Sequence, residues 1–387
     1  MSLRYGLYFA ILALSKRLEV SNKTDSHIDK VTSVSHSELD DFMGFLEYVE
    51  DLDNPHIRPR IVRTRRNPLE SLDDLDFFKR YRISREIFLF ILHKIDESLE
   101  YESDRNCSIC PAVQLMVALR FYATGSHLIA VGDIHGIHNS TVSRIVKKVS
   151  HAIVGLRRQF IKFPSTVEEI RTCQRQFYSI AQFPFVIGTI DCTHVKIQSP
   201  GGVDAELFRN RKGYFSVNVQ TVSDAQTRVL NVVARWPGST HDSAIFTNST
   251  IHHQFESGLY RNSCLLGDSG YPIKQYLLTP YLNPRTVAEE NYNTSQIKTR
   301  NTVERQYGIM KRRFPALAYG LRIKLDTTID VIISCCILHN ICIQFRENVP
   351  SDQDQHMQNV IEEGQINYNT DDPTDGRGID RRALIDL

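Results

Sequence analysis

Apolar residues along the chain follow two spacings, and the change falls near residue 180. Between residues 76 and about 153 they recur every three or four positions, as in 77–92 and 111–122, which is typical of helices that bury one face. From residue 185 short β-branched runs predict strands, and these cover 185–197, 215–222, 228–236 and 263–266. Helical spacing returns over 243–255, 300–313 and 328–345. This order predicts an α/β domain that follows an all-helical module.

Apart from one short stretch, the two ends of the chain lack such spacing. An amphipathic first helix is expected at 7–14, the following residues are polar to about 50, and 58–66 hold five arginines in nine positions. Residues 346–387 are expected to be disordered, because they have too few apolar residues for a core. The predicted organisation is an N-terminal extension (1–55), a basic linker and helical module (56–170), an α/β domain (175–345) and an acidic disordered tail (346–387).

Charge and composition exclude few classes of protein. The 387 residues carry a net charge of +1, but residues 350–387 hold nine acids and three arginines, so the rest of the chain is mildly basic. Such a body permits a polyanionic partner without requiring one. No run reaches the roughly 18 apolar residues of a membrane span, and we expect no membrane association.

The eight cysteines are scattered, which suits a reducing compartment. Cys107 and Cys110 have zinc-ligand spacing, but no second pair follows at the distance of a zinc finger. The cysteines and histidine within 335–342 lie in an apolar helical run, and core packing is the better interpretation.

Residues 127–149 predict a helix-turn-helix. We expect Ile129, Ala130 and Ile134 to form the apolar face of its first helix, Gly136 to make the turn, and Asn139 or Ser140 to cap the second helix. Val142, Ile145, Val146 and Val149 would pack that second helix, while Thr141, Ser143, Arg144, Lys147 and Lys148 would face outward. Short polar and cationic side chains suit a DNA major groove and its phosphates. The alternative is a plain helical hairpin with a solvated cationic face.

Three acids are candidate metal ligands. The chain has no G-x-S-x-G, H-E-x-x-H or P-loop motif. Asp191 ends the apolar run that begins at 185, Asp268 ends the run that begins at 264, and Glu304 lies on the helix predicted over 300–313. A carboxylate in a buried strand is costly unless it meets a cation, and oxygen ligands favour Mg²⁺ or Mn²⁺ over zinc. For any one of these acids alone, a cap or a salt bridge is the simpler role.

The spacing of the acids strengthens the metal interpretation. Thirty-five residues separate Asp268 from Glu304, and the order strand, strand, strand, helix, strand, helix places Asp191 on the first strand and Asp268 on the fourth. This is the D-D-35-E arrangement of an RNase H-like fold. We therefore predict an RNase H-like catalytic domain, with a mixed five-stranded sheet and flanking helices, preceded by the helix-turn-helix module.

Seven separated motifs give the sequence a family resemblance. They are DCTHV (191–195), RNRKGYFSVNVQ (209–220), WPGSTHDS (236–243), LLGDSGYP (265–272), LTPY (278–281), VERQYGIMKRRF (303–314) and LHNIC (338–342). In this order, over roughly residues 75–345, the chain closely resembles the PIF/Harbinger transposases and the nucleases derived from them.

The resemblance implies roles for particular residues. Asp191, Asp268 and Glu304 match the metal-binding triad of DNA-cleaving transposases, and the matching motif adds Asp242 as a ligand or as an acid behind the ligands. His194 and His241 would orient carboxylates or bind phosphate, or would be ordinary hydrogen-bonding histidines. Phosphate contacts are expected from Arg209, Arg211, Lys212, Lys311, Arg312 and Arg313, with a merely solvated basic face as the alternative.

The expected function is that of a metal-dependent DNA endonuclease, derived from or encoded by a Harbinger-type transposon, that hydrolyses or transfers DNA phosphodiesters by two-metal catalysis with Mg²⁺ or Mn²⁺. The alternative is a catalytically idle platform for DNA or protein binding. The resemblance also implies a Myb/SANT-like DNA-binding partner protein, and a homo-oligomer is a second expected assembly. The expected location is the nucleus, with the cytoplasm as a second location. The basic run at 58–66 would be a nuclear-import signal, a phosphate-binding arm or a solvated linker.

Overall fold

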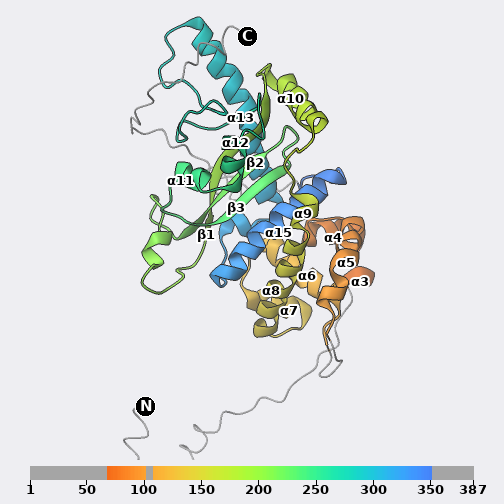
Figure 1. Ribbon diagram of the computed structural model, residues 1–387. Coiled ribbons are helices and arrows are strands. Elements are labelled where there is room, and N and C mark those ends of the chain that lie inside the picture. Colours follow the sequence, from red (N-terminus) through yellow and green to blue (C-terminus); the bar gives the residue numbers. More distant parts are fainter. Residues whose placement is uncertain (1–67, 102–107, 351–387) are drawn as a thin grey trace, which may run out of the picture. The chain divides into compact units, whose positions relative to one another are not determined.

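The computed structural model describes residues 68–101 and 108–350 (Figure 1). Several expectations fall outside these ranges: the first helix at 7–14, the basic run at 58–66, the pairing of Cys107 with Cys110, and the tail beyond residue 350.

The first part of the described chain consists of helices. They are α3 (Pro68–Ser71), α4 (Asp74–Tyr81), α5 (Arg85–Leu99), α6 (Pro111–Thr124), α7 (Leu128–His135), α8 (Asn139–Gly155) and α9 (Arg157–Phe160). Local signals set their ends: the side chains of Asp73 and Ser84 cap α4 and α5, and Gly125 ends α6 in the left-handed region with φ of 62°.

The packing of α7 differs from the expectation. Ile129 and Ile134 are 59% and 61% exposed, and Ala130 is exposed with them. Instead Val131, Gly132 and His135 are buried, because α7 turns this side toward α8. A Cβ atom on Gly132 would lie 2.3 Å from the carbonyl oxygen of Ile137, so the close approach requires glycine here.

The turn into α8 and its buried side follow the prediction more closely. Gly136 has φ of 63° and makes the turn, although His138, rather than Asn139 or Ser140, caps α8. The expected inner positions of α8 are buried: Val142, Ile145, Val146 and Val149.

The strands form one mixed sheet of five, in the order β3-β2-β1-β4-β5. They are β1 (Val186–Lys196), β2 (Ser216–Ser223), β3 (Val229–Pro237), β4 (Cys264–Leu266) and β5 (Leu277–Leu278). The β1–β2 and β2–β3 pairs are antiparallel, whereas β1–β4 and β4–β5 are parallel. This confirms a mixed five-stranded sheet with flanking helices, although β5 is too short to be read from periodicity.

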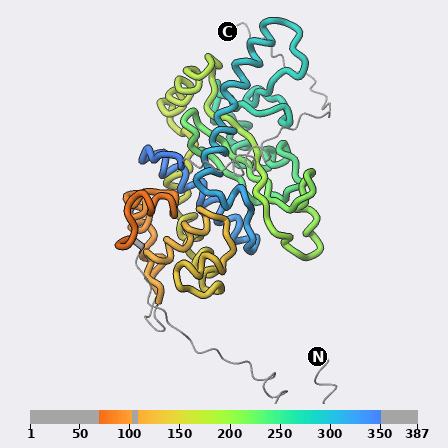
Figure 2. Tube along the Cα trace, turned by 180° about the vertical axis from the view of Figure 1, so that it is seen from behind, coloured from red at the N-terminus to blue at the C-terminus, as the bar shows by residue number. Residues whose placement is uncertain are grey.

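The remaining helices are α10 (Val167–Ala181), the 3₁₀ helix η1 (Ala205–Phe208), α11 (Asp242–Thr247), α12 (Thr250–Glu256), α13 (Val287–Arg313), α14 (Ala316–Tyr319) and α15 (Leu325–Gln344). The single helix predicted over 243–255 is two helices, because Ser249 caps a new one. α13 is the long central helix in the rear view (Figure 2). It begins before the predicted residue 300, at a capping box of Thr286 and Glu289.

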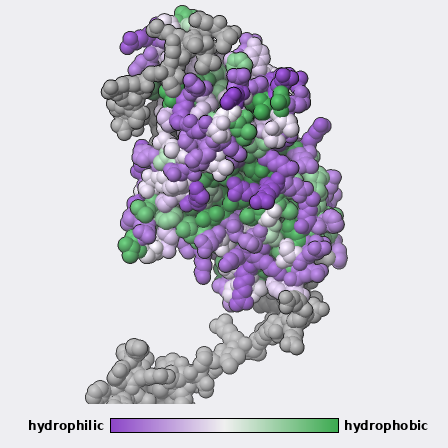
Figure 3. Space-filling view, viewed as in Figure 1, coloured by the Kyte–Doolittle hydropathy of each residue, from purple (hydrophilic) through white to green (hydrophobic). Residues whose placement is uncertain are grey.

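Helices cover both faces of the sheet. A continuous core joins α4–α8 to α13, α15 and one face of the sheet, where Val217 and Val219 of β2 are buried. On the other face, Val222 packs with Ile190 of β1 and with Phe246 and Phe255 of α11 and α12. Polar residues cover much of the surface in Figure 3, with apolar patches between them.

The core helix α15 is buried on all sides between Val331 and Cys342. By length and composition α15 could cross a membrane, but 78% of its most apolar 18-residue stretch is buried inside the protein. Cys335, Cys336, Cys342 and His339 are buried within it, as expected for core residues.

The LHNIC motif closes the edge of the sheet. Asn340 accepts a 2.8 Å hydrogen bond from the amide of Val229 on the edge strand β3, and its side-chain nitrogen donates to the carbonyls of Val229 and Phe160. His339 Nε2 lies 2.8 Å from the carbonyl oxygen of Thr227. This motif therefore binds backbone groups that would otherwise be buried without partners.

Candidate active site

Two aspartates lie at the same edge of the sheet. The parallel pairing of β1 with β4 ends at Thr189 and Leu266, and Asp191 and Asp268 each lie two residues further along. Because neighbouring parallel strands end at one edge, their following side chains converge. Asp268 follows its strand as expected, and Asp191 lies within β1, inside the strand predicted over 185–197. β1 continues to Lys196, because β2 still pairs with it after β4 has turned away.

The third acid, Glu304, lies on α13, which packs against β1. Tyr307, one turn further along the same side of α13, donates a 2.7 Å hydrogen bond to the main-chain oxygen of Asp191. The same hydroxyl accepts hydrogen bonds from the amide and the side chain of Thr221. These contacts hold Glu304 beside Asp191.

An arginine that sequence reasoning missed lies between the acids. Arg300 Nη1 is 3.3 Å from Asp191 Oδ2, and Arg300 Nη2 is 2.5 Å from Glu304 Oε1. The Arg300 side chain is only 13% exposed. The four-residue spacing from Arg300 to Glu304 was the available signal, because residues so spaced are neighbours on a helix.

Asp242 begins α11 and is held from β2. Asn218 Nδ2 donates to Asp242 Oδ1 and to the carbonyl oxygen of Thr240, both at 2.9 Å. These two acceptors set the orientation of the amide and leave Asn218 Oδ1 buried without a hydrogen-bond partner. An acceptor of this kind suits a cation or a donor beside Asp242.

Burial raises the pKa values of Asp191, Asp242 and Asp268. Burial raises the pKa of Asp191; the charges of Asp268 and Asp242 add to this, and the ion pair with Arg300 opposes it. Burial, then Asp242, raises the pKa of Asp268, and burial raises the pKa of Asp242. Arg300 also feels the charges of Asp191, Glu304 and Asp268. The residues thus form one electrostatic cluster, in which an added cation would favour the ionised acids.

The donor set fits a hard divalent cation, because it offers carboxylate oxygens and a buried amide oxygen. Among the residues that the structure describes, however, no three acidic, histidine or cysteine side chains are grouped as a ready-made metal site. Asp191 and Glu304 instead form ion pairs with Arg300.

The cations predicted on α8 divide into two kinds. Arg144 and Lys147 are exposed, as expected. Lys148 donates to the carbonyl oxygens of Leu99 and Glu100 at 2.7 and 3.0 Å and lies over the ring of Tyr101. Lys148 therefore binds the end of α5 and does not point freely outward.

The loop between β1 and β2 borders the acids. Arg209 pairs with Glu206 at 2.7 Å and stacks on Phe215. Arg211, which is exposed, contacts the ring of His241 next to Asp242. Lys212 is exposed on the same loop. Arg211 thus lies close enough to Asp242 to lower its pKa, whereas Lys212 acts on His194 and Lys311.

The last turn of α13 corrects two predictions. Lys311 and Arg313 are each 2% exposed. Lys311 Nζ donates to Thr193 Oγ1 at 2.8 Å, and Arg313 donates to main-chain oxygens of Arg82, Glu347 and Asn348. As placed, neither can bind a DNA phosphate, because α13 ends inside the core. Arg312 is half-buried and bonds to its own helix.

The two histidines of the motifs also differ. His194 Nδ1 lies 3.1 Å from Ser216 Oγ, and burial with the charges of Lys311 and Lys212 lowers its pKa to about 4. His194 is therefore neutral at physiological pH. His241 is exposed beside Arg211.

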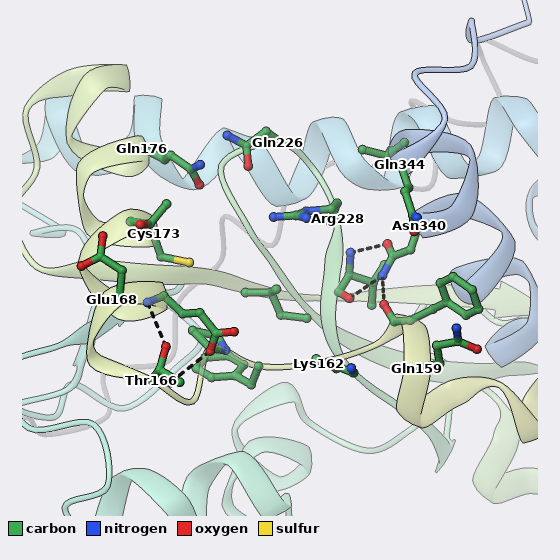
Figure 4. A pocket seen from close by; sticks show the side chains of 18 of the residues that line it. Gln159, Lys162, Thr166, Glu168, Cys173, Gln176, Gln226, Arg228, Asn340 and Gln344 are labelled. Carbon is green, nitrogen blue, oxygen red and sulfur yellow. Dashed lines mark hydrogen bonds between the residues drawn. The ribbon is translucent and has the colours of Figure 1, made fainter.

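A cavity of about 900 Å³ lies elsewhere, between α9, α10, the start of β3 and the end of α15 (Figure 4). Its lining includes Cys173, Arg228 and Asn340 and none of the four acids. The side chains that would hold a metal are thus outside this cavity.

Comparison with known proteins adds an independent line of evidence. Residues 190–340 match the family described as DDE superfamily endonuclease. This span contains Asp191, Asp242, Asp268 and Glu304. No solved structure matches the chain significantly.

Individual relatives extend over most of the chain. It is 31% identical over 307 residues to "Putative nuclease HARBI1" of Homo sapiens. The aligned region covers 76% of this chain and 88% of that protein. The protein of the same name from Mus musculus is 33% identical over the same length. "Protein ALP1-like" of Arabidopsis thaliana is 26% identical over 304 residues, 73% of this chain and 74% of the relative.

Proposed function

The chain belongs to the DDE superfamily endonucleases, among the Harbinger transposase-derived nucleases, and from this premise we propose that it is a divalent-metal-dependent DNA nuclease. The observation that carries the proposal is the convergence of Asp191, Asp268 and Glu304 at one edge of the sheet. The relatives' name, a nuclease, supports DNA as the substrate.

The arrangement of the strands supports an RNase H-like domain. Three antiparallel strands followed by two parallel strands, in the order β3-β2-β1-β4-β5, place the first acid on the central strand. The second acid follows β4, and the third lies on a helix against β1. We keep the division near residues 170–175 between the helical module and the nuclease domain as a prediction.

Asp191, Asp268 and Glu304 would hold the metal, with Asp242 as a fourth acid supported by Asn218. Bound Mg²⁺ or Mn²⁺ would activate a water or a 3′-hydroxyl for attack on a phosphodiester and stabilise the charge that develops. The chain's own contribution is to position the acids: Tyr307 holds α13 against β1. Arg211 and Lys212 would bind the backbone of the DNA near Asp242.

The helical module would contribute further DNA contacts. Arg144 and Lys147 are exposed on α8, the second helix of the predicted helix-turn-helix. Exposed cations on such a helix support binding to phosphates along a groove. A Myb/SANT-like partner, a homo-oligomer and a nuclear location are further proposals that follow from the family.

A non-cleaving platform is the second candidate. The observation that favours it is Arg300, which already neutralises part of the acid cluster without a metal. In that case the protein would bind DNA or a partner, and its acids would have only a structural role.

The decisive experiment is nicking of supercoiled plasmid by the full chain with Mg²⁺ or Mn²⁺, with and without EDTA. Asp268→Asn is the control, because it keeps the shape of the side chain and removes its charge. We expect metal-dependent nicking that Asp268→Asn abolishes while DNA binding persists. DNA binding without nicking under every metal condition would favour the platform, and equal nicking by Asp268→Asn would refute the site.

A further inference from the structure

Arg300 contacts one carboxylate oxygen on each of two acids that would hold a metal. Its two terminal nitrogens contact Asp191 Oδ2 and Glu304 Oε1, which belong to two of the three predicted ligands. The pair with Glu304 lies within one turn of α13, whereas the pair with Asp191 joins α13 to β1. Arg300 thus links the helix and the strand at the point where a metal would link them.

Both cations cannot use these oxygens in the same way. A metal ligand donates a lone pair directly to the ion, and the guanidinium holds the same oxygens by charge-assisted hydrogen bonds. Two cations at one pair of oxygens would also repel each other. Metal binding through Asp191 and Glu304 therefore competes with Arg300.

A displaced Arg300 would need a new anion. Its side chain is mostly buried, and a buried guanidinium without a partner is strongly unfavourable. Arginine matches a phosphate as well as it matches a carboxylate, because its fork can donate two parallel hydrogen bonds. The anion that a nuclease brings to these acids is a DNA phosphate.

On the basis of the proposed function, we propose that Arg300 is an internal counter-ion that the divalent metal displaces, and that the released guanidinium then binds the DNA phosphate at the site. Metal and DNA would consequently bind with positive coupling. By reciprocity, the metal raises the affinity for DNA by the same factor as DNA raises the affinity for the metal.

The first test measures Mn²⁺ binding to the full chain by calorimetry without DNA. Arg300→Gln removes the charge, while Arg300→Lys keeps it but loses the fork that bridges two carboxylates. We expect both variants to bind Mn²⁺ more tightly than the parent, Arg300→Gln by about five- to a hundredfold. If charge repulsion alone mattered, Arg300→Lys would match the parent, and that result would overturn the proposal.

Glu304→Gln separates this inference from the proposed function. Loss of Mn²⁺ binding in Glu304→Gln, with unchanged or weaker binding in both Arg300 variants, would overturn the inference and leave the metal site intact. Absence of Mn²⁺ binding in the parent and in both Arg300 variants would overturn both. Binding in Arg300→Gln but not in the parent would support the displacement. Circular dichroism and thermal unfolding in EDTA identify any variant that has lost its fold.

The second test measures DNA affinity with and without Ca²⁺, which prefers the same oxygen ligands. We expect Ca²⁺ to increase the affinity of the parent for a DNA duplex. The factor of increase in the parent should be at least about five times the factor in Arg300→Gln. Equal increases in the two proteins would refute the role of the released guanidinium.

Discussion

The hydroxyl group of Tyr307 donates a 2.7 Å hydrogen bond to the main-chain oxygen of Asp191, and so joins α13 to the strand that carries the first acid. It also accepts hydrogen bonds from the amide and side chain of Thr221 on β2. One buried phenol therefore connects the helix of Glu304 to two strands. The position of Glu304 relative to Asp191 depends on this connection.

Tyr307→Phe should lower the free energy of unfolding by about 1–3 kcal/mol, because buried groups of Asp191 and Thr221 lose their partner. Nicking activity should fall as well, since α13 loses its anchor to β1. Urea unfolding measures the first effect and plasmid nicking the second. Tyr178→Phe is the matched control, because Tyr178 is exposed, and it should change the stability by less than about 0.5 kcal/mol. Equal effects of the two substitutions would contradict the anchoring role.

Lys311 predicts a pH dependence of stability. Burial, with Lys212 and Lys196 nearby, lowers its pKa from 10.5 to about 8. Between these values the unfolded chain holds a proton that the folded chain has lost, so the unfolding free energy rises with pH in this window. The cost of the buried charge is present in full below pH 8.

Lys311→Met removes this titration and keeps most of the side-chain length. The stability of the parent minus that of Lys311→Met should therefore increase from pH 8 to 10.5, as measured by urea unfolding at each pH. Lys147→Met, at an exposed position, should give a constant difference. A flat difference for Lys311→Met would show that the buried ammonium does not titrate in this window.

The cations of α8 predict a contrast between neighbours. Lys147→Ala should reduce the slope of log DNA affinity against log salt concentration by about one, because one phosphate contact is lost. Lys148→Ala should leave that slope unchanged but lower the thermal stability, because Lys148 binds the carbonyl oxygens of Leu99 and Glu100. DNA titrations at several salt concentrations measure the slope. An unchanged slope in Lys147→Ala would favour the plain helical hairpin.

Substitution of Asn340 should lower the stability of the protein and leave its metal binding unchanged. Asn340→Asp keeps the acceptor for the amide of Val229 but removes the donor to the carbonyls of Val229 and Phe160. The unfolding free energy should fall by about 1–3 kcal/mol, while Mn²⁺ affinity should stay the same because Asn340 lies apart from the four acids. A large change in Mn²⁺ affinity would show that the edge of the sheet and the acids are coupled.

Several features of the fold follow from local sequence alone. The alternation of β-branched residues located β1 to β4, and the spacing of Val142, Ile145, Val146 and Val149 identified the buried side of α8. Where local signals were weak, the prediction failed. β5 has two residues, and the first half of α13 has too few apolar positions to show a helical period.

The sequence by itself determined which residue types and spacings the site has: three acids, their order, and the 35 residues between Asp268 and Glu304. Tertiary structure alone decided which cations face these acids. Lys311 and Arg313 are buried and Arg300 lies between Asp191 and Glu304, although all three are ordinary basic residues on one helix. The reason is physical: periodicity reports the local direction of a side chain, whereas burial and ion pairing depend on surfaces that distant parts of the chain bring together.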